Sequence, residues 1–223
     1  MRYKAAIFDM DGTVLDTAED LRRAISYAMQ EAGYGEAEFS RAQACAFFGS
    51  GVRVAIKRAL AELGREANDA EVLRIEKIYR PYYAEHCDEA TGAFPGICEM
   101  LMHLRETGIR TAVVSNKPDA AAKELSEKHF GELMEMTSGE REAEGIRRKP
   151  APDMVFDVCR LLGVKPEEAV YVGDSEVDIE TAESAGMPCI CVSWGFRDTG
   201  ALRECGADVI CDTADELEKA ITG

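Results

Sequence analysis

Short apolar runs rich in Val, Ile and Ala recur along the chain, and longer amphipathic stretches separate them. Runs without polar alternation are typical of strands that are buried on both faces of a parallel sheet. The predicted strands are Tyr3–Phe8, Thr111–Val114, Glu135–Thr137, Ala169–Val172, Pro188–Val192 and Asp208–Ile210.

The stretches between these strands carry apolar residues at helical spacing. Gly96–Thr107 has one apolar face and is followed by Gly108, and Pro152–Leu162 is followed by Gly163. Glycine directly after the last periodic residue is a common helix stop. Strands that alternate with helices predict an α/β fold, a doubly wound and mostly parallel Rossmann-like sheet.

One segment, from residue 16 to about residue 90, lacks any strand pattern and shows successive helical stripes instead. The stripes are Leu21, Ile25, Ala28 and Met29; Val52, Ile56, Ala59, Leu60 and Leu63; and Val72, Ile75, Tyr79, Tyr82 and Tyr83. Pro81 is expected to end or kink the third helix, and the tyrosines are expected to lie in the core of this insert. The sequence thus predicts an α/β core domain (1–15 and 91–223) and an all-helical cap domain (16–90).

The chain of 223 residues has a net charge of −16, which disfavours nucleic acid and anionic membrane surfaces as partners. No apolar run approaches the roughly 20 residues of a membrane span. Eight cysteines are scattered without a CxxC pair, so reduced thiols are expected rather than disulfides or zinc. We expect a soluble cytoplasmic protein, monomer or homodimer.

Acidic and hydroxyl side chains follow the predicted strands. Asp9 and Asp11 come after the first strand, Ser115 and Asn116 after the second, and Asp174 after the fourth. In an open α/β sheet, ligands bind at the carboxyl ends of the strands. Neighbouring carboxylates there need a cation, and oxygen ligands in this number suit Mg²⁺. The sequence therefore predicts a magnesium site at this edge.

Four short segments make the pattern specific. They are Asp9–Thr17 (DMDGTVLDT), residues 115–116 (SN), residues 149–150 (KP) and Gly173–Asp178 (GDSEVD). In type, order and spacing they resemble the four motifs of the haloacid dehalogenase superfamily, over essentially the whole chain. The insert after the first motif looks like the helical cap of that superfamily's first cap class.

The resemblance implies phosphoryl chemistry, and the residues suit it. Asp9 would be the nucleophile that forms an aspartyl phosphate, and Asp11 would protonate the leaving group and later activate water. Ser115, Lys149 and backbone N–H groups near Asn116 would hold the phosphoryl group. Dehalogenases lack the second acid and ion-pumping ATPases carry Thr there, whereas phosphatases and phosphomutases keep Asp.

The resemblance also implies a ligand set for Mg²⁺. It comprises the side chain of Asp9, the backbone carbonyl of Asp11 and the side chain of Asp174. Asp178, four residues further along, would act as an outer ligand or through water.

One loop of the cap offers a substrate contact. Gly49, Ser50 and Gly51 precede the second apolar stripe, and Arg53 follows them. Glycines and a helix N-terminus can hold an anion, and Arg53 could clamp a carboxylate. The loop resembles the glycine-containing cap loop of bacterial phosphoglycolate phosphatases. The alternative is a tight turn followed by a surface arginine.

Together these features predict a Mg²⁺-dependent phosphomonoester hydrolase for a small phosphorylated metabolite, with 2-phosphoglycolate as the first candidate. Two enzymatic alternatives remain open: a β-phosphoglucomutase-like phosphosugar mutase and an inorganic pyrophosphatase. A phospho-aspartate signalling or binding protein is the alternative from another class. It is disfavoured because a receiver domain is shorter and has neither the cap insert nor a use for the general acid Asp11.

Overall fold

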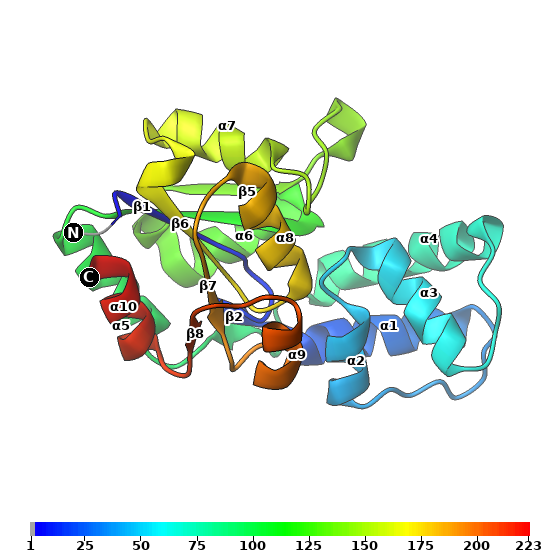
Figure 1. Ribbon diagram of the computed structural model, residues 1–223. Coiled ribbons are helices and arrows are strands. Elements are labelled where there is room, and N and C mark those ends of the chain that lie inside the picture. Colours follow the sequence, from blue (N-terminus) through cyan, green and yellow to red (C-terminus); the bar gives the residue numbers. More distant parts are fainter. Residues whose placement is uncertain (1–2) are drawn as a thin grey trace. The chain divides into compact units, whose positions relative to one another are not determined.

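The computed structural model describes residues 3–223. The chain forms two compact units (Figure 1), one comprising Met1–Asp16 and Ala93–Gly223 and the other Thr17–Gly92. We call the first the core and the second the cap. The sequence predicted a cap of residues 16–90, and the cap in the structure comprises Thr17–Gly92.

A six-stranded sheet in the order β5-β4-β1-β6-β7-β8 forms the centre of the core, and all neighbouring strands run parallel. This confirms the predicted α/β class, and each of the six predicted strands overlaps an observed one. The strands are β1 (Ala5–Phe8), β4 (Arg110–Pro118), β5 (Met136–Glu140), β6 (Ala169–Gly173), β7 (Cys189–Val192) and β8 (Ile210–Cys211).

Helices connect these strands and cover both faces of the sheet (Figure 1). They are α5 (Ile97–Glu106), α6 (Asp119–Phe130), α7 (Asp153–Leu162), α8 (Glu176–Ala185), α9 (Thr199–Glu204) and α10 (Ala214–Thr222), with short 3₁₀ turns η1 (Gly131–Leu133), η2 (Glu142–Glu144) and η3 (Pro166–Glu168). Both faces must be covered because the central strands are apolar on each side.

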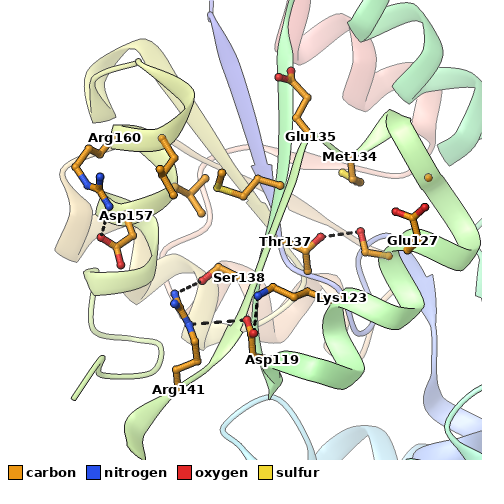
Figure 2. A pocket seen from close by; sticks show the side chains of 15 residues that line it. Asp119, Lys123, Glu127, Met134, Glu135, Thr137, Ser138, Arg141, Asp157 and Arg160 are labelled. Atoms are coloured by element: carbon orange, nitrogen blue, oxygen red, sulfur yellow. Dashed lines mark hydrogen bonds and ion pairs between the residues drawn. The ribbon is translucent and has the colours of Figure 1, made fainter. Parts of the chain in front are cut away.

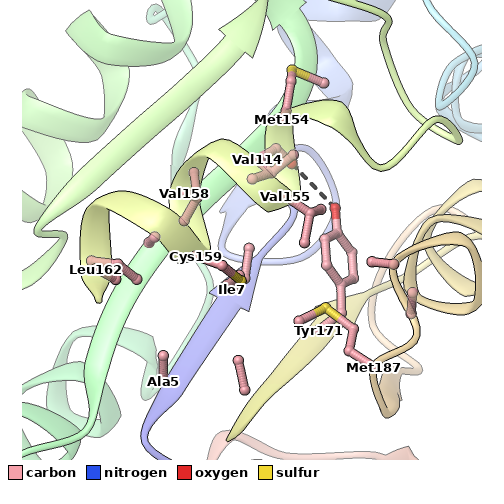
Figure 3. Packing of buried hydrophobic residues seen from close by; sticks show 14 residues of the cluster. Ala5, Ile7, Val114, Met154, Val155, Val158, Cys159, Leu162, Tyr171 and Met187 are labelled. Atoms are coloured by element: carbon pink, nitrogen blue, oxygen red, sulfur yellow. Dashed lines mark hydrogen bonds between the residues drawn. The ribbon is translucent and has the colours of Figure 1, made fainter. Parts of the chain in front are cut away.

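Helix α7 shows how the sequence directs this packing (Figure 3). Val155, Val158 and Leu162 lie on one helical face and pack on Ile7 and Tyr171 of the central strands, all of them buried. Each such apolar side chain stabilises the fold by about 1.5–3 kcal/mol on burial. This packing fixes β1 and β6, the strands whose ends carry the motif acids.

The two chain segments that join the core and the cap pair as a small two-stranded sheet. These are β2 (Leu15–Asp16) and β3 (Gly92–Ala93). Strands of two residues are too short for a hydrophobic pattern, which is why the sequence did not predict them.

The cap contains four helices: α1 (Ala18–Glu31), α2 (Arg41–Phe47), α3 (Val52–Glu62) and α4 (Asp69–His86). The sequence predicted three helical stripes and missed α2, since seven residues are too few for a clear stripe. Its start was marked by a capping box, in which Ser40 and Gln43 bond each other's backbone N–H. Pro81 was predicted to end or kink the third helix, and it does not end it, because α4 continues to His86.

The tyrosines of α4 divide between two environments. Tyr79 and Tyr83 are buried and stack on each other, as predicted for the core of the cap. Tyr82 is half-exposed and stacks on Tyr27 of α1 and against His86. The prediction of a core position therefore fails for Tyr82.

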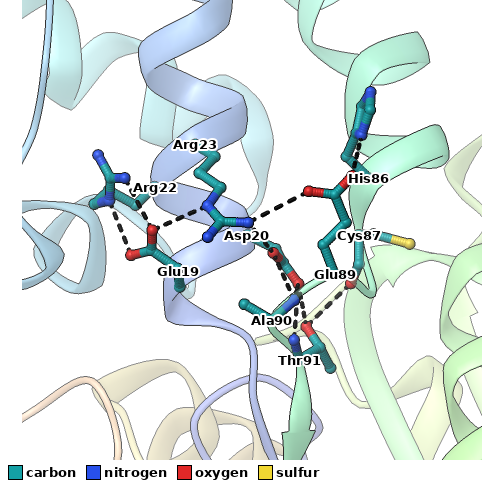
Figure 4. A network of polar contacts seen from close by, with 9 residues as sticks. All are labelled: Glu19, Asp20, Arg22, Arg23, His86, Cys87, Glu89, Ala90 and Thr91. Atoms are coloured by element: carbon teal, nitrogen blue, oxygen red, sulfur yellow. Dashed lines mark hydrogen bonds and ion pairs between the residues drawn. The ribbon is translucent and has the colours of Figure 1, made fainter.

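Buried Asp20 links the start of α1 to the end of the cap (Figure 4). Its carboxylate accepts hydrogen bonds from the backbone N–H of Ala90 and from the backbone N–H and hydroxyl of Thr91, at 2.8–3.1 Å. Around it, Arg23 contacts Glu89 at 3.3 Å. The network joins the first and last segments of the cap.

None of the eight cysteines, all of which lie within residues 3–223, forms a disulfide. Within residues 3–223, no helix combines the length and the apolar character needed to cross a bilayer.

Candidate active site

The register of the central strands brings the sequence motifs to one edge of the sheet. Phe8, the last residue of β1, lies opposite Val113 of β4 and Val172 of β6. Asp9 follows directly and donates its backbone N–H to the Val172 carbonyl at 2.8 Å. The next residues of β4 and β6 therefore extend beside Asp9.

Three buried carboxylates meet at this edge. Asp9, Asp174 and Asp178 each offer an oxygen, and these oxygens lie within 4.8 Å of one another. All three residues are at most 6% exposed. Hard oxygen donors gathered in a buried site match the ligands that Mg²⁺ prefers, so the donor set fits a divalent cation.

Lys149 lies among these acids. Its Nζ is 2.8 Å from Oδ1 of Asp9 and 2.8 Å from Oδ1 of Asp178, and it lies 5.7 Å above the centre of the Tyr171 ring. The Lys149–Pro150 peptide bond is cis. The lysine thus contacts both the expected nucleophile and the last acid of the fourth motif.

The second oxygen of Asp178 is also occupied by protein donors. Oδ2 accepts the backbone N–H groups of Asp174 and Ser175 and the hydroxyl of Ser175, at 2.7–3.2 Å. A side chain on Gly173 would collide with Asp178, since its Cβ would lie 2.2 Å from the Asp178 Cβ. Asp178 therefore holds Lys149 and the loop after β6, with both oxygens already bonded.

Asp174 sits in a close-fitting pocket of the core. Its Oδ1 accepts from the Thr13 hydroxyl at 3.0 Å, and its Oδ2 accepts from the Phe196 backbone N–H at 2.6 Å. A Cβ on Gly12 would lie 2.3 Å from Asp174 Oδ2, and one on Gly195 would lie 2.4 Å from the same atom. Only glycine at positions 12 and 195 leaves room for the Asp174 carboxylate.

Burial dominates the acid–base behaviour of this cluster. It raises the pKa of Asp9 to about 7, Lys149 opposes the rise, and Asp178 and Asp11 add to it. Burial, together with the charges of Asp178 and Asp9, also raises the pKa of Asp174. Burial opposes the charge of Lys149, yet the carboxylates of Asp178 and Asp9 raise its pKa above the usual value. Further positive charge would favour the ionised acids.

The remaining core residues expected at the site lie on β4 and just after β1. Ser115 is buried, and its Oγ accepts the backbone N–H of Lys117 at 3.2 Å. Asn116 donates from Nδ2 to the Lys149 carbonyl at 3.2 Å, which links the second and third motifs. The carboxylate of Asp11 forms an ion pair with Lys117, with Nζ to Oδ1 at 2.9 Å.

The predicted cap residues lie in the other unit. Gly49, Ser50 and Gly51 connect α2 to α3, and Gly49 and Gly51 adopt φ angles of 110° and 87°, which favour glycine. Gly51 is the N-cap of α3. The half-exposed Arg53 donates from Nε to Oε2 of the buried Glu76 at 2.7 Å.

Comparison with known proteins decides the family. Residues 6–192 match the profile of haloacid dehalogenase-like hydrolases. The chain belongs to this family. A phosphoglycolate phosphatase of Pseudomonas savastanoi pv. phaseolicola is 31% identical over 224 residues, which cover 99% of this chain and 79% of the relative.

Solved structures agree with this assignment. A protein of Lactobacillus delbrueckii subsp. bulgaricus, provisionally assigned as a phosphoglycolate phosphatase, is 46% identical, with a TM-score of 0.94 and 99% coverage of both chains. CbbY of Rhodobacter sphaeroides, in complex with phosphate, is 25% identical, with a TM-score of 0.74 and 96% coverage of both. This haloacid dehalogenase-like hydrolase is a phosphatase that acts on a phosphorylated substrate.

Sequence reasoning missed several residues of the site in this hydrolase. Thr13 and Phe196 bond Asp174, Tyr171 lies beneath Lys149, and Lys117 pairs with Asp11. Thr13 and Lys117 stood inside or beside motif segments and could have been considered there. Phe196 contributes a backbone N–H, which no side-chain pattern reveals.

A separate hollow of about 530 Å³ lies beside the edge strand β5, between α6 and α7 (Figure 2). Its wall carries both charges, with Lys123 and Arg141 near Asp119, and Arg160 near Asp157. None of the motif acids lines it, so this hollow and the acid cluster are different places in the core.

Proposed function

We propose that this enzyme is a Mg²⁺-dependent phosphomonoesterase that works through an aspartyl phosphate on Asp9 and that 2-phosphoglycolate is its substrate. The observation that carries the proposal is the cluster in which buried Asp9 lies beside Asp174 and 2.8 Å from Lys149. Phosphoryl transfer needs positive charge around the phosphoryl oxygens, and Lys149 together with a bound Mg²⁺ ion would supply it here.

In the first step, a carboxylate oxygen of Asp9 attacks phosphorus, and the bond from phosphorus to the ester oxygen breaks. The electron pair of that bond leaves with the alkoxide, which takes a proton from the Asp11 carboxyl group. In the second step, water attacks the phosphoryl group, Asp11 takes back a proton, and Asp9 is released with inorganic phosphate. Asp11 thus donates a proton in the first step and accepts one in the second.

Asp9, Asp174 and the backbone carbonyl of Asp11 would hold the Mg²⁺ ion. When bound, the ion supplies positive charge that offsets the phosphoryl oxygens and the carboxylates. Asp178 is proposed as an outer residue, because Lys149 and the loop N–H groups already occupy its oxygens.

The phosphoryl group would be held by Ser115, Lys149 and backbone N–H groups near Asn116. The ammonium group of Lys149 is held 2.8 Å from Oδ1 of Asp178, so it needs to move little when substrate binds. The ion pair with Lys149 favours the charged form of the nucleophile and so opposes burial, which raises the pKa of Asp9 to about 7.

The proposal for 2-phosphoglycolate rests on the cap loop and on the named relatives. Arg53 donates from Nε to Glu76, and its guanidinium is the cap group that we propose to bind the substrate carboxylate. The relatives named as phosphoglycolate phosphatases support the same substrate.

The test is phosphate release with Mg²⁺ from 2-phosphoglycolate, β-glucose 1-phosphate, pyrophosphate and common nucleotide monophosphates, with parallel detection of isomerised sugar phosphate. We expect kcat/KM for 2-phosphoglycolate to exceed the others by about a hundredfold, or about 2.7 kcal/mol. Isomerised sugar without free phosphate would favour a mutase instead. Equal and weak rates would contradict the assignment of substrate.

A further inference from the structure

The end of β4 is irregular in a way that redirects its side chains. Val114 lies opposite Ser138 of β5, whereas Pro118 lies opposite Glu140, so β4 advances four residues while β5 advances two. Extra residues of this kind re-aim side chains near functional sites. Lys117 lies within this irregular segment and is 5% exposed.

The ammonium group of Lys117 contacts Asp11, the second acid of the first motif. Nζ lies 2.9 Å from Oδ1 of Asp11, and the side chain of Lys117 is 2% exposed, against 17% for Asp11. Placing a lysine charge in such a buried position is costly unless it is paired, so the contact is a built part of the site. The two acids of the first motif therefore have separate lysines: Lys149 for Asp9 and Lys117 for Asp11.

We propose that Lys117 is a positioning residue that holds the Asp11 carboxyl group for proton transfer to the leaving oxygen. The inference rests on the proposed function, in which Asp11 is the general acid. An acid must present one oxygen to the leaving group, and a lysine on Oδ1 fixes the direction of the other oxygen. A small displacement of such a group costs much of its catalytic effect.

This role predicts a dependence on the leaving group. Departure of an alkoxide requires a proton, and general acid catalysis contributes about 10²- to 10⁴-fold in rate. The phenolate of p-nitrophenyl phosphate leaves with little help. Loss of Lys117 should therefore impair alkyl phosphomonoesters more than p-nitrophenyl phosphate. A lysine that bound the phosphoryl group directly would affect both substrates equally.

The experiment measures kcat/KM of Lys117→Met and Lys117→Arg for both classes, with 2-phosphoglycolate as the first alkyl substrate. Lys123→Met is the matched control, because Lys123 lies six residues on, is 57% exposed and pairs with Asp119 outside the site. We expect Lys117→Met to lose about 30- to 100-fold on the alkyl ester and less than about threefold on p-nitrophenyl phosphate. Lys117→Arg should show the same selective loss to a smaller extent. This variant provides the test if Lys117→Met does not fold.

A double-mutant cycle with Asp11→Asn tests whether Lys117 acts through Asp11. On the alkyl ester, kcat/KM of the double variant should be no lower than that of Asp11→Asn alone. Equal losses on both substrates, or losses that multiply in the cycle, would overturn the positioning role while leaving the proposed function intact. A wild-type enzyme that hydrolyses neither class would overturn the proposed function, and this inference with it.

Discussion

The ammonium group of Lys149 lies 2.8 Å from Oδ1 of Asp9, with both side chains buried. Burial is the largest cause of the raised pKa of Asp9, Asp178 and Asp11 add to the rise, and Lys149 opposes it. The same lysine contacts Asp178 at 2.8 Å. Removing it would leave two buried carboxylates without their shared cation.

Replacement of Lys149 by Met should therefore affect both stability and activity. We expect a loss of about 3–5 kcal/mol in the free energy of unfolding, the usual cost of breaking a buried ion pair. Activity should fall by about 10²- to 10³-fold, the effect of losing one preorganised charge donor. Urea unfolding and phosphate release measure the two effects. Lys165→Met is the control, since Lys165 is 74% exposed; equal behaviour of the two variants would contradict the account.

Gly195→Ala tests the pocket around Asp174. The added Cβ would lie 2.3 Å from the Asp174 Cβ, so the carboxylate must shift. Because Gly195 has no positive φ, space alone decides the outcome. We expect weaker binding of Mg²⁺, measured by calorimetry, and a higher Mg²⁺ concentration for half-maximal activity.

Gly200→Ala is the control for that change, as its Cβ would approach only the Asp198 side chain, at 3.1 Å. It should leave the Mg²⁺ dependence unchanged. A Gly195→Ala enzyme with wild-type Mg²⁺ affinity would contradict the assignment of Asp174 as a ligand.

Arg53→Met tests the contact with the substrate carboxylate. We expect kcat/KM to fall by about 10- to 100-fold for 2-phosphoglycolate, as for loss of a charged hydrogen bond of about 1.5–3 kcal/mol. Ethyl phosphate, which lacks the carboxylate, should be much less affected. Arg80→Met is a matched control because Arg80 contacts the same Glu76, at 2.5 Å. Similar losses for both arginines or for both substrates would show that the effect is structural.

Asp20→Asn tests the polar network of the cap. The substitution turns one acceptor oxygen into a donor that faces the N–H groups of Ala90 and Thr91. An unsatisfied buried donor costs about 1–3 kcal/mol, so urea unfolding should show a loss of at least about 2 kcal/mol. Glu89→Gln, at a 47% exposed side chain of the same network, should change stability by less than about 0.5 kcal/mol. Equal stabilities would contradict the role of Asp20.

The central strands β1 and β6 were predictable because their apolar runs are fully buried and long enough to recognise in the sequence. Helix α2 was not, since its signal lay in the Ser40 and Gln43 capping box rather than in a stripe. Pro81 lies inside α4, which continues to His86, so a proline in the sequence did not mark the end of this helix. The prediction and the structure thus differ at α2, whose sequence pattern is short, and at Pro81, where one residue was given too much weight.

The motif acids were predictable as a group because parallel strands end at one edge. The partner of Asp11 was not, since Lys117 reaches it only through the irregular end of β4, which depends on the pairing with β5. The bonding of both Asp178 oxygens likewise follows from the folded loop after β6. Spacing in sequence identifies such acids but does not tell which of them have room for a metal ion.

The most direct test of the central claim is the rate of phosphate release from 2-phosphoglycolate by wild type and Asp9→Asn, each with Mg²⁺ and with EDTA. Circular dichroism would verify that the variant keeps the fold. The account predicts turnover only for wild type with Mg²⁺, because Asp9 serves both as nucleophile and as metal ligand. Surviving activity in Asp9→Asn, or wild-type activity that EDTA does not reduce, would contradict it.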